Sequence, residues 1–223
     1  MGVGHIAVAL GASRAAPRVN VGWFVFAALL SDFLLGIFAW LGLEHSSVPE
    51  NYANRHYLLF TFPYSHGLVP LLLWAAIFGL LVAAIYRFDR SRIWLVVAAL
   101  VLSHFVLDGI VHVAGLPLAG ENSPKFGLGL WNHMRLELLL ETLMAIAGTA
   151  IYWRIMGTGK FALSRYGMAV FILLVTAMTW TQLFLTVPPP PQQLTASWIV
   201  VPLLFAAIAY ALDRRRVRFA VPA

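Results

Sequence analysis

Long apolar runs alternate with short polar segments along the whole chain. A transmembrane helix needs about 20 mostly apolar residues, and six runs provide roughly that number. A shorter apolar stretch, residues 2–12, precedes them and predicts an interfacial or re-entrant helix. The six predicted spans are approximately 19–43, 68–86, 93–114, 131–155, 166–187 and 196–212. We therefore predict an all-α integral membrane protein, a six-transmembrane helical bundle with a short N-terminal apolar helix.

The composition agrees with this pattern. Hydrophobic residues make up 61% of the chain and charged residues only 11%, whereas a soluble domain is about 25% charged. The 223 residues suffice for a single transmembrane domain. Within it, residues 1–156 carry the polar positions discussed below, and residues 157–223 hold the last two spans and a basic tail. The absence of cysteine excludes disulfides and thiolate metal ligands.

The basic residues are distributed asymmetrically about the predicted spans. Twelve of the 15 Lys and Arg residues lie in the N-terminal segment, the second-to-third and fourth-to-fifth connections and the tail. The opposite loops hold Arg55 and Lys125, and Arg135 lies just inside the fourth span. The positive-inside rule therefore predicts that both termini are cytoplasmic. The net charge of +6 thus reflects membrane topology, and the predicted partner is a lipid bilayer rather than nucleic acid.

The third span carries a polar stripe. His104, Asp108 and His112 are spaced i, i+4, i+8, which places their side chains on one face of a helix. An ionisable group in hydrocarbon costs about 2.5–3.5 kcal/mol, so three on one stripe require compensation. A bound metal, or a polar cavity facing other helices, would supply it.

Other spans bring ionisable residues to the same depth. Asp32 lies near the middle of the first span and His66 opens the second. In the fourth span, Glu137 and Glu141 descend from the same side as His66. The last two spans contain no internal carboxylate or histidine, so we interpret them as structural or lipid-facing elements.

Histidine and carboxylate ligands suit a divalent metal, zinc first, with Mn, Fe and Co as alternatives. Such an ion lowers the pKa of bound water to about 7 and supports hydrolysis. We predict a polar pocket between the first four spans, rimmed by residues 44–63 and 115–130. Glu137 is the candidate general base, and His112 the candidate acid or supporting group. The candidate metal ligands are Asp32, His66, His104, Asp108 and His5.

Simpler interpretations remain open. His104 and Asp108 could form only an interhelical hydrogen bond, and Arg135 could pair with Glu137 or Glu141 in a buried ion network. For the whole protein there are two further alternatives. One is a haem-binding membrane anchor with His66 and His104 as axial ligands. The other is a non-catalytic subunit or transporter with a buried polar network.

Short motifs occur in a recognisable order over roughly residues 4–141. They are Gly4-His5, Leu30-Ser31-Asp32, Pro63-Tyr64-Ser65-His66-Gly67, Leu102-Ser103-His104-Phe105-Val106-Leu107-Asp108 and Gly127-Leu128-Gly129-Leu130-Trp131-Asn132, the last followed by Glu137 and Glu141. The chain resembles the bacterial membrane-bound metal-dependent hydrolases, a family related to the LexA-regulated inner-membrane proteins. The resemblance implies a metal-dependent hydrolase in the bacterial inner membrane. Because the polar residues lie in the outer half of the spans, we expect it to act from the outer face, on a lipid or other amphiphile. Ser31 and Gly67 depart from the family's usual Pro and Ser. Ala114-Gly115 stands where one branch of the family has Pro-Asp, so one family carboxylate is missing.

Overall fold

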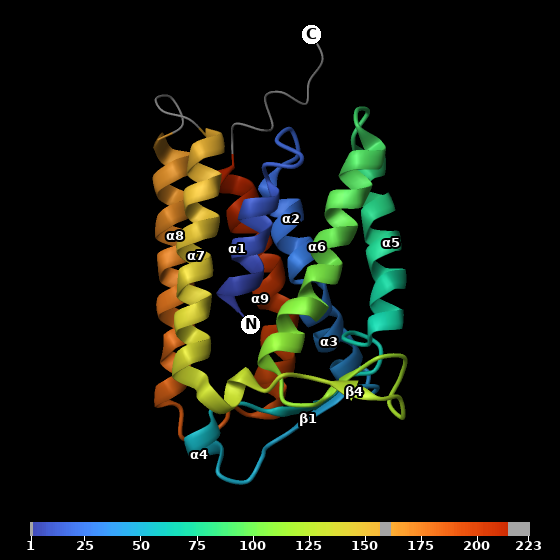
Figure 1. Cartoon of the computed structure of the whole chain (residues 1–223), viewed down its shortest axis with the longest axis vertical. Helices are drawn as coiled ribbons and strands as arrows, with labels where there is room; N and C mark the ends of the chain where they lie inside the picture. Colours follow the sequence, from blue (N-terminus) through green and yellow to red (C-terminus); the bar gives the residue numbers. More distant parts are fainter. Residues whose placement is uncertain (1, 157–161, 214–223) are drawn as a thin grey trace.

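The computed structural model describes residues 2–156 and 162–213, and it is a bundle of helices with short connections (Figure 1). Within these residues, five helices are long and apolar enough to cross a membrane, and a bent pair of helices makes a sixth candidate if the pair counts as one span. The all-α membrane fold is therefore confirmed. The five helices are α5 (Leu68–Ile85), α6 (Arg90–Val111), α7 (Met134–Met156), α8 (Ala162–Trp180) and α9 (Pro191–Leu212).

The first span is broken, whereas the sequence predicted one continuous helix. It consists of α2 (Val21–Ala28) and α3 (Leu30–Trp40), which meet at an angle of 52°. Asn20 begins the first half, since its side-chain oxygen accepts a hydrogen bond from the Gly22 N–H. Leu29 forms the break, so Asp32 lies in the first turn of the second half.

The N-terminal helix α1 (Val3–Ala12) lies inside the bundle, packed against α7, α2 and α6. Its side chains at Val3, Ile6 and Leu10 are fully buried, which contradicts the interfacial alternative and agrees with the re-entrant one. Close approach to α7 depends on Gly148, where a Cβ atom would overlap the backbone of Ala7. Small residues commonly allow membrane helices to approach in this way.

Helix α9 packs along both halves of the broken span. A Cβ atom at Gly36 of α3 would lie 2.7 Å from the Ile199 side chain and 2.8 Å from its backbone nitrogen. The contact therefore has no room for a larger residue. This helix therefore has the structural role that the sequence analysis allowed, and it faces the broken span on one side.

One end of the bundle, which we call the loop face, carries the longer connections. Strand β1 (His45–Ser47) pairs with β2 (Leu59–Thr61), and β3 (Leu116–Pro117) pairs with β4 (Lys125–Phe126), both antiparallel. Three short helices complete this face. They are α4 (Tyr52–Arg55), the 3-10 helix η1 (Leu130–His133) before α7, and the 3-10 helix η2 (Thr181–Phe184) after α8.

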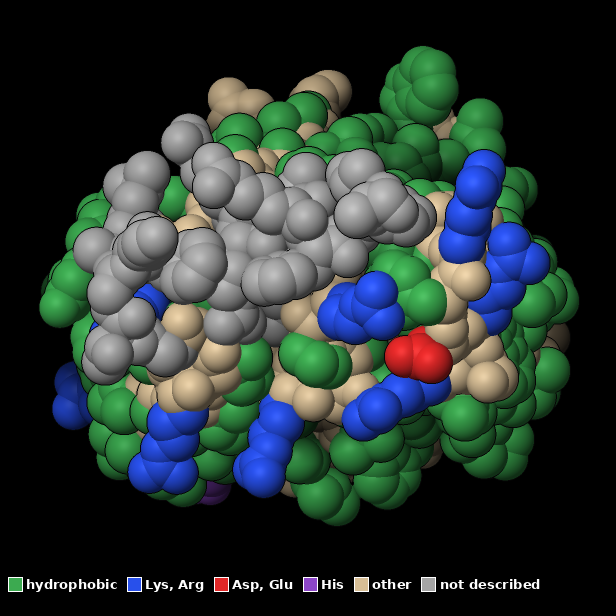
Figure 2. Space-filling model, turned by 90° about the horizontal axis from the view of Figure 1, so that it is seen from above, with side chains coloured by type: hydrophobic (Ala, Val, Ile, Leu, Met, Phe, Trp, Pro, Cys, Tyr) green, Lys and Arg blue, Asp and Glu red, His purple; other side chains and the backbone are tan. Residues whose placement is uncertain are grey.

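The opposite end, the basic face, carries short turns. Figure 2 looks down on it and shows Lys and Arg side chains spread around the helix ends. The sequence analysis also assigns Lys160 and the basic tail, residues 214–218, to this side, and both lie outside the described residues. The described basic residues on this face are Arg14, Arg18, Arg87, Arg90, Arg92, Arg154 and Arg165.

Candidate metal centre

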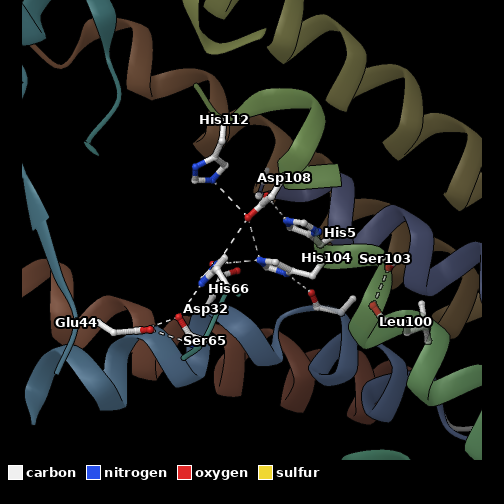
Figure 3. A network of polar contacts seen from close by, with 12 residues as sticks. His5, Asp32, Glu44, Ser65, His66, Leu100, Ser103, His104, Asp108 and His112 are labelled. Atoms are coloured by element: carbon white, nitrogen blue, oxygen red, sulfur yellow. Dashed lines mark hydrogen bonds and ion pairs between the residues drawn. The ribbon is translucent and has the colours of Figure 1, made fainter. Parts of the chain in front are cut away.

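Four elements bring the five candidate ligands to one place inside the bundle (Figure 3). His5 comes from α1, Asp32 from α3, and His66 from the residues just before α5. His104 and Asp108 lie one turn apart on α6. The Asp32 side chain is 31% exposed, whereas the other four side chains are 3% exposed or less. The cluster is thus buried, with one carboxylate reaching an opening.

Asp108 contacts four imidazoles. Its Oδ1 atom lies 3.2 Å from His5 Nε2. Its Oδ2 atom lies 3.2 Å from His104 Nε2, 3.4 Å from His112 Nε2 and 3.6 Å from His66 Nε2. The i, i+4 spacing of the stripe on α6 produces the contacts with His104 and His112.

The break in the first span fixes the tautomer of His104. Its Nδ1 atom lies 2.7 Å from the carbonyl oxygen of Ala28, the last residue of α2. A carbonyl oxygen only accepts hydrogen bonds, so Nδ1 carries the hydrogen and donates it. The Nε2 atom of His104 therefore directs a lone pair into the cluster.

A relay through the loop face fixes His66 in the same way. Its Nδ1 lies 2.7 Å from Ser65 Oγ, and that hydroxyl donates to Glu44 Oε2 at 2.6 Å. Because the hydroxyl hydrogen is used on Glu44, Ser65 Oγ accepts from His66 Nδ1–H. The Nε2 atom of His66 is again left with a lone pair facing the cluster.

Glu44 is a supporting residue that the sequence analysis placed only in a loop. Its Oε1 atom also accepts hydrogen bonds from the Tyr64 and Ser65 N–H groups, at 2.7 and 2.8 Å. Burial raises the pKa of Glu44 above its ordinary value, and these hydrogen bonds act in the opposite direction. A carboxylate next to the end of an apolar run was the one signal in the sequence that pointed to it.

The two histidine lone pairs meet at short distance. His66 Nε2 and His104 Nε2 are 3.2 Å apart, and Asp32 Oδ1 lies 3.8 Å from each. Two lone pairs at this separation repel unless a cation lies between them. Zinc ligands lie about 2.0–2.2 Å from the ion, so two ligand atoms of a tetrahedral site are about 3.3–3.6 Å apart. The donor atoms of Asp32, His66 and His104 lie within 4.8 Å of one another, and Asp108 Oδ2 lies 3.2 Å from His104 Nε2 and 3.6 Å from His66 Nε2, so this group has the chemistry and approximate spacing for such an ion.

His5 offers a second grouping with His104 and Asp108, whose donor atoms lie within 4.8 Å of one another. Its ring stacks on that of His104, with centroids 3.9 Å apart and planes 3° from parallel. Its Nδ1 atom is buried and has no hydrogen-bond partner. His5 therefore holds Asp108 and His104 in position and is an alternative ligand.

A cavity of about 280 Å³ reaches the cluster. Its ionisable lining consists of Asp32, His66, Asp108 and His112. Phe60 and Phe62 also line it, and they belong to residues 44–63, one of the two loops predicted to form the rim. The remaining walls differ from the prediction, since α9 contributes one side and residues 115–130 contribute none. The α9 side consists of Ser197, Trp198, Val201, Pro202 and Phe205.

The two candidate proton-transfer residues lie in different settings. His112 lines the cavity, with its ring 3.9 Å from the Trp131 ring centroid. Glu137 is buried and hydrogen-bonded to Glu141, and it does not line the cavity. Glu141 in turn accepts hydrogen bonds from the Gly2 and Gly4 N–H groups at the start of α1.

Arg135 does not take part in that carboxylate pair. It is exposed near the loop face, and among the described residues no ion pair joins it to Glu137 or Glu141. The alternative of a buried ion network around Arg135 is therefore not the arrangement found.

The chain was also compared with known proteins. No protein family, characterised protein or solved structure matches it. The geometry of the cluster is therefore the basis for a functional proposal.

Proposed function

We propose that this chain is a metal-dependent hydrolase of a bacterial inner membrane, acting on a lipid or other amphiphile. The observation that carries the proposal is the pair of Nε2 lone pairs of His66 and His104, 3.2 Å apart beside two carboxylates. Both rings donate their Nδ1 hydrogens elsewhere, so both Nε2 atoms are available to one ion. Zinc is the first choice among divalent ions because the ligands are nitrogen and oxygen.

A bound ion would supply a polarised water as nucleophile. His66, His104 and Asp108 would hold the ion from the buried side of the cluster. Asp32 reaches the cavity, so it can act as a fourth ligand or contact the substrate side of the ion. His112 contacts both Asp108 and the cavity, which suits it to carry a proton to or from a reacting group. Glu137 would act on the site only through another residue.

The cavity walls support an amphiphilic substrate. One end is polar, and the rest is formed by aromatic and aliphatic side chains such as Phe60, Trp131 and Phe205. Ligand pockets typically combine an apolar lining with a few convergent polar groups. A substrate with a hydrolysable polar group and an apolar remainder fits this division.

The alternatives fit the geometry less well. Axial haem ligands face each other across the macrocycle, whereas the facing nitrogens of His66 and His104 leave no gap for a ring. A non-catalytic polar network would need no lone pairs directed at one another and no cavity at the cluster.

Metal analysis of the full chain tests the proposal. Protein purified in detergent without added metal should contain about one divalent ion, and a strong chelator should remove it. Esters, amides and phosphodiesters of long-chain alcohols should then be screened with metal-loaded and metal-free protein. Loss of hydrolysis on chelation and recovery on reloading are expected. A stable protein that neither contains nor binds a divalent ion would refute the proposal.

A further inference from the structure

A second hollow, of about 660 Å³, lies on the loop face and shares no lining residue with the cavity at the metal cluster. It is bounded by α4, η1, the start of α7 and η2, and Figure 1 shows α4 beneath the loop-face ends of α7 and α8. These ends are the limits of two membrane spans, so the hollow lies at the depth of lipid headgroups. We propose that it binds the phosphate of an anionic phospholipid in the adjacent leaflet.

The polar lining consists of groups that can donate hydrogen bonds. It comprises Asn54, His56, Asn132, His133 and Arg135, and none of the described acidic residues lines the hollow. Arg135 has no ion-pair partner among the described residues, and guanidinium groups bind phosphate through two parallel hydrogen bonds. Among the Lys and Arg residues that the structure describes, it is one of three on this side, with Arg55 and Lys125, whereas seven lie at the basic face.

A chain of hydrogen bonds orients the amide of Asn132. The Arg55 guanidinium donates to the Tyr57 hydroxyl at 2.9 Å, and that hydroxyl donates to Asn132 Oδ1 at 3.1 Å. With its oxygen occupied, Asn132 presents its amide nitrogen as a donor. His56 is fixed as well, since its Nδ1–H donates to the Leu185 carbonyl at 3.1 Å and ties α4 to the segment after η2.

An apolar edge adjoins these donors and favours a lipid over a free anion. Leu136, Leu183 and Phe184 also line the hollow. The Phe184 side chain is 81% exposed and Leu136 is 55% exposed. Acyl chains beside Leu136 and Phe184 would continue the bilayer, while the phosphate would lie against Arg135 and Asn132.

Lipid retention by the full chain tests the site. Delipidated protein in dodecyl maltoside is mixed with micelles containing equal amounts of dioleoyl phosphatidylglycerol and dioleoyl phosphatidylcholine, and bound lipid is measured by native mass spectrometry. The wild-type chain should retain phosphatidylglycerol preferentially. Arg135→Gln should weaken that retention about 10- to 100-fold, because charge-assisted hydrogen bonds are lost. Arg154→Gln, an exposed position at the basic-face end of the same helix, is the matched control and should retain the lipid.

Three outcomes would overturn the proposal. They are equal retention by wild type and Arg135→Gln, an equal loss in Arg154→Gln, and displacement of the lipid by millimolar inorganic phosphate alone. The last outcome would assign the hollow to a free anion. Metal content is measured on the same samples and should be unchanged in Arg135→Gln. A failure of this lipid site is therefore distinguishable from a failure of the metal centre.

Discussion

At the scale of single residues, the same dipeptide has two different roles. Ser65-His66 precedes α5, where the Ser65 hydroxyl can reach both the neighbouring ring and Glu44. Ser103-His104 lies within α6, and there the Ser103 hydroxyl donates to the Leu100 carbonyl of its own helix at 2.7 Å. Figure 3 shows these two serines pointing to different partners. The backbone around a serine therefore decides whether it supports a ligand.

This contrast gives a matched pair of variants. Ser65→Ala removes the group that accepts from His66 Nδ1, so it should lower metal affinity about 10–100-fold. Ser103→Ala removes only a hydrogen bond within a helix and should leave metal affinity unchanged. Both affinities can be measured by competition with a fluorescent zinc chelator. Equal effects in the two variants would contradict the relay through Glu44.

The ligands themselves give a second prediction. His104→Ala and Asp108→Ala should each lose bound metal, since each removes a donor atom at the centre of the cluster. His112→Ala should retain metal with an affinity about 10–100-fold lower, because it contacts the cluster through Asp108. His45→Ala, an exposed histidine on β1, is the control. Elemental analysis of the purified variants checks all four, and wild-type metal content in both His104→Ala and Asp108→Ala would refute the assignment.

Much of the candidate site was predictable because ionisable residues are conspicuous in apolar runs. Asp32, His66, His104 and Asp108 stand out in this way, and helical spacing places the last two on one face. The sequence could not identify the Ala28 carbonyl, because every residue has one and only the bend exposes it.

At the scale of elements, two features of the bundle were not visible in the sequence. The break at Leu29 occurs inside a continuous apolar run with no proline, so hydropathy predicts a straight helix. Helix α9 has no internal charge, so the sequence indicates only a structural or lipid-facing element and does not reveal that it lines the cavity. Its cavity side is aromatic and aliphatic, with Trp198 and Phe205, and this composition resembles a lipid-facing surface.

The contact between α3 and α9 gives a third prediction. Gly36→Val should force these helices apart, because even a Cβ atom there would lie 2.7 Å from Ile199. Overpacking of this kind costs about 1–3 kcal/mol, so the thermal midpoint in detergent should fall. Gly11→Ala in α1 is the control, since its nearest neighbour, Ile151 Cδ1, would be 3.8 Å away. An unchanged midpoint in Gly36→Val would show that the α3–α9 contact is looser than described.

At the scale of the whole molecule, the charge asymmetry and the helix order agree. Seven described arginines lie at the basic face, and the paired strands lie at the other end. The fold class was therefore predictable from hydropathy alone, because lipid exposure requires helices of this length, and the six predicted spans agree with the structure if the bent pair counts as one span. The packing of α1 inside the bundle was not, because eleven apolar residues are compatible with several depths.

Topology in the membrane gives a fourth prediction. A reporter fused after Ala223 should be cytoplasmic, and one inserted near Ser123, between β3 and β4, should be on the outer side. Alkaline phosphatase and green fluorescent protein fusions distinguish the two locations. The same sidedness for both sites would contradict the six-span arrangement.

The bend at Leu29 also makes the cluster sensitive to bilayer thickness. Straightened, residues 21–40 would be about 30 Å long, and the 52° bend shortens their reach across the membrane by about a tenth. The bend also joins two parts of the cluster, since the Ala28 carbonyl orients His104 and Asp32 lies four residues further on. A thicker bilayer favours the straight form, which would move both the Ala28 carbonyl and the Asp32 side chain away from the rest of the cluster. Zinc affinity should therefore fall in vesicles of long-chain lipids compared with short-chain lipids, measured by chelator competition.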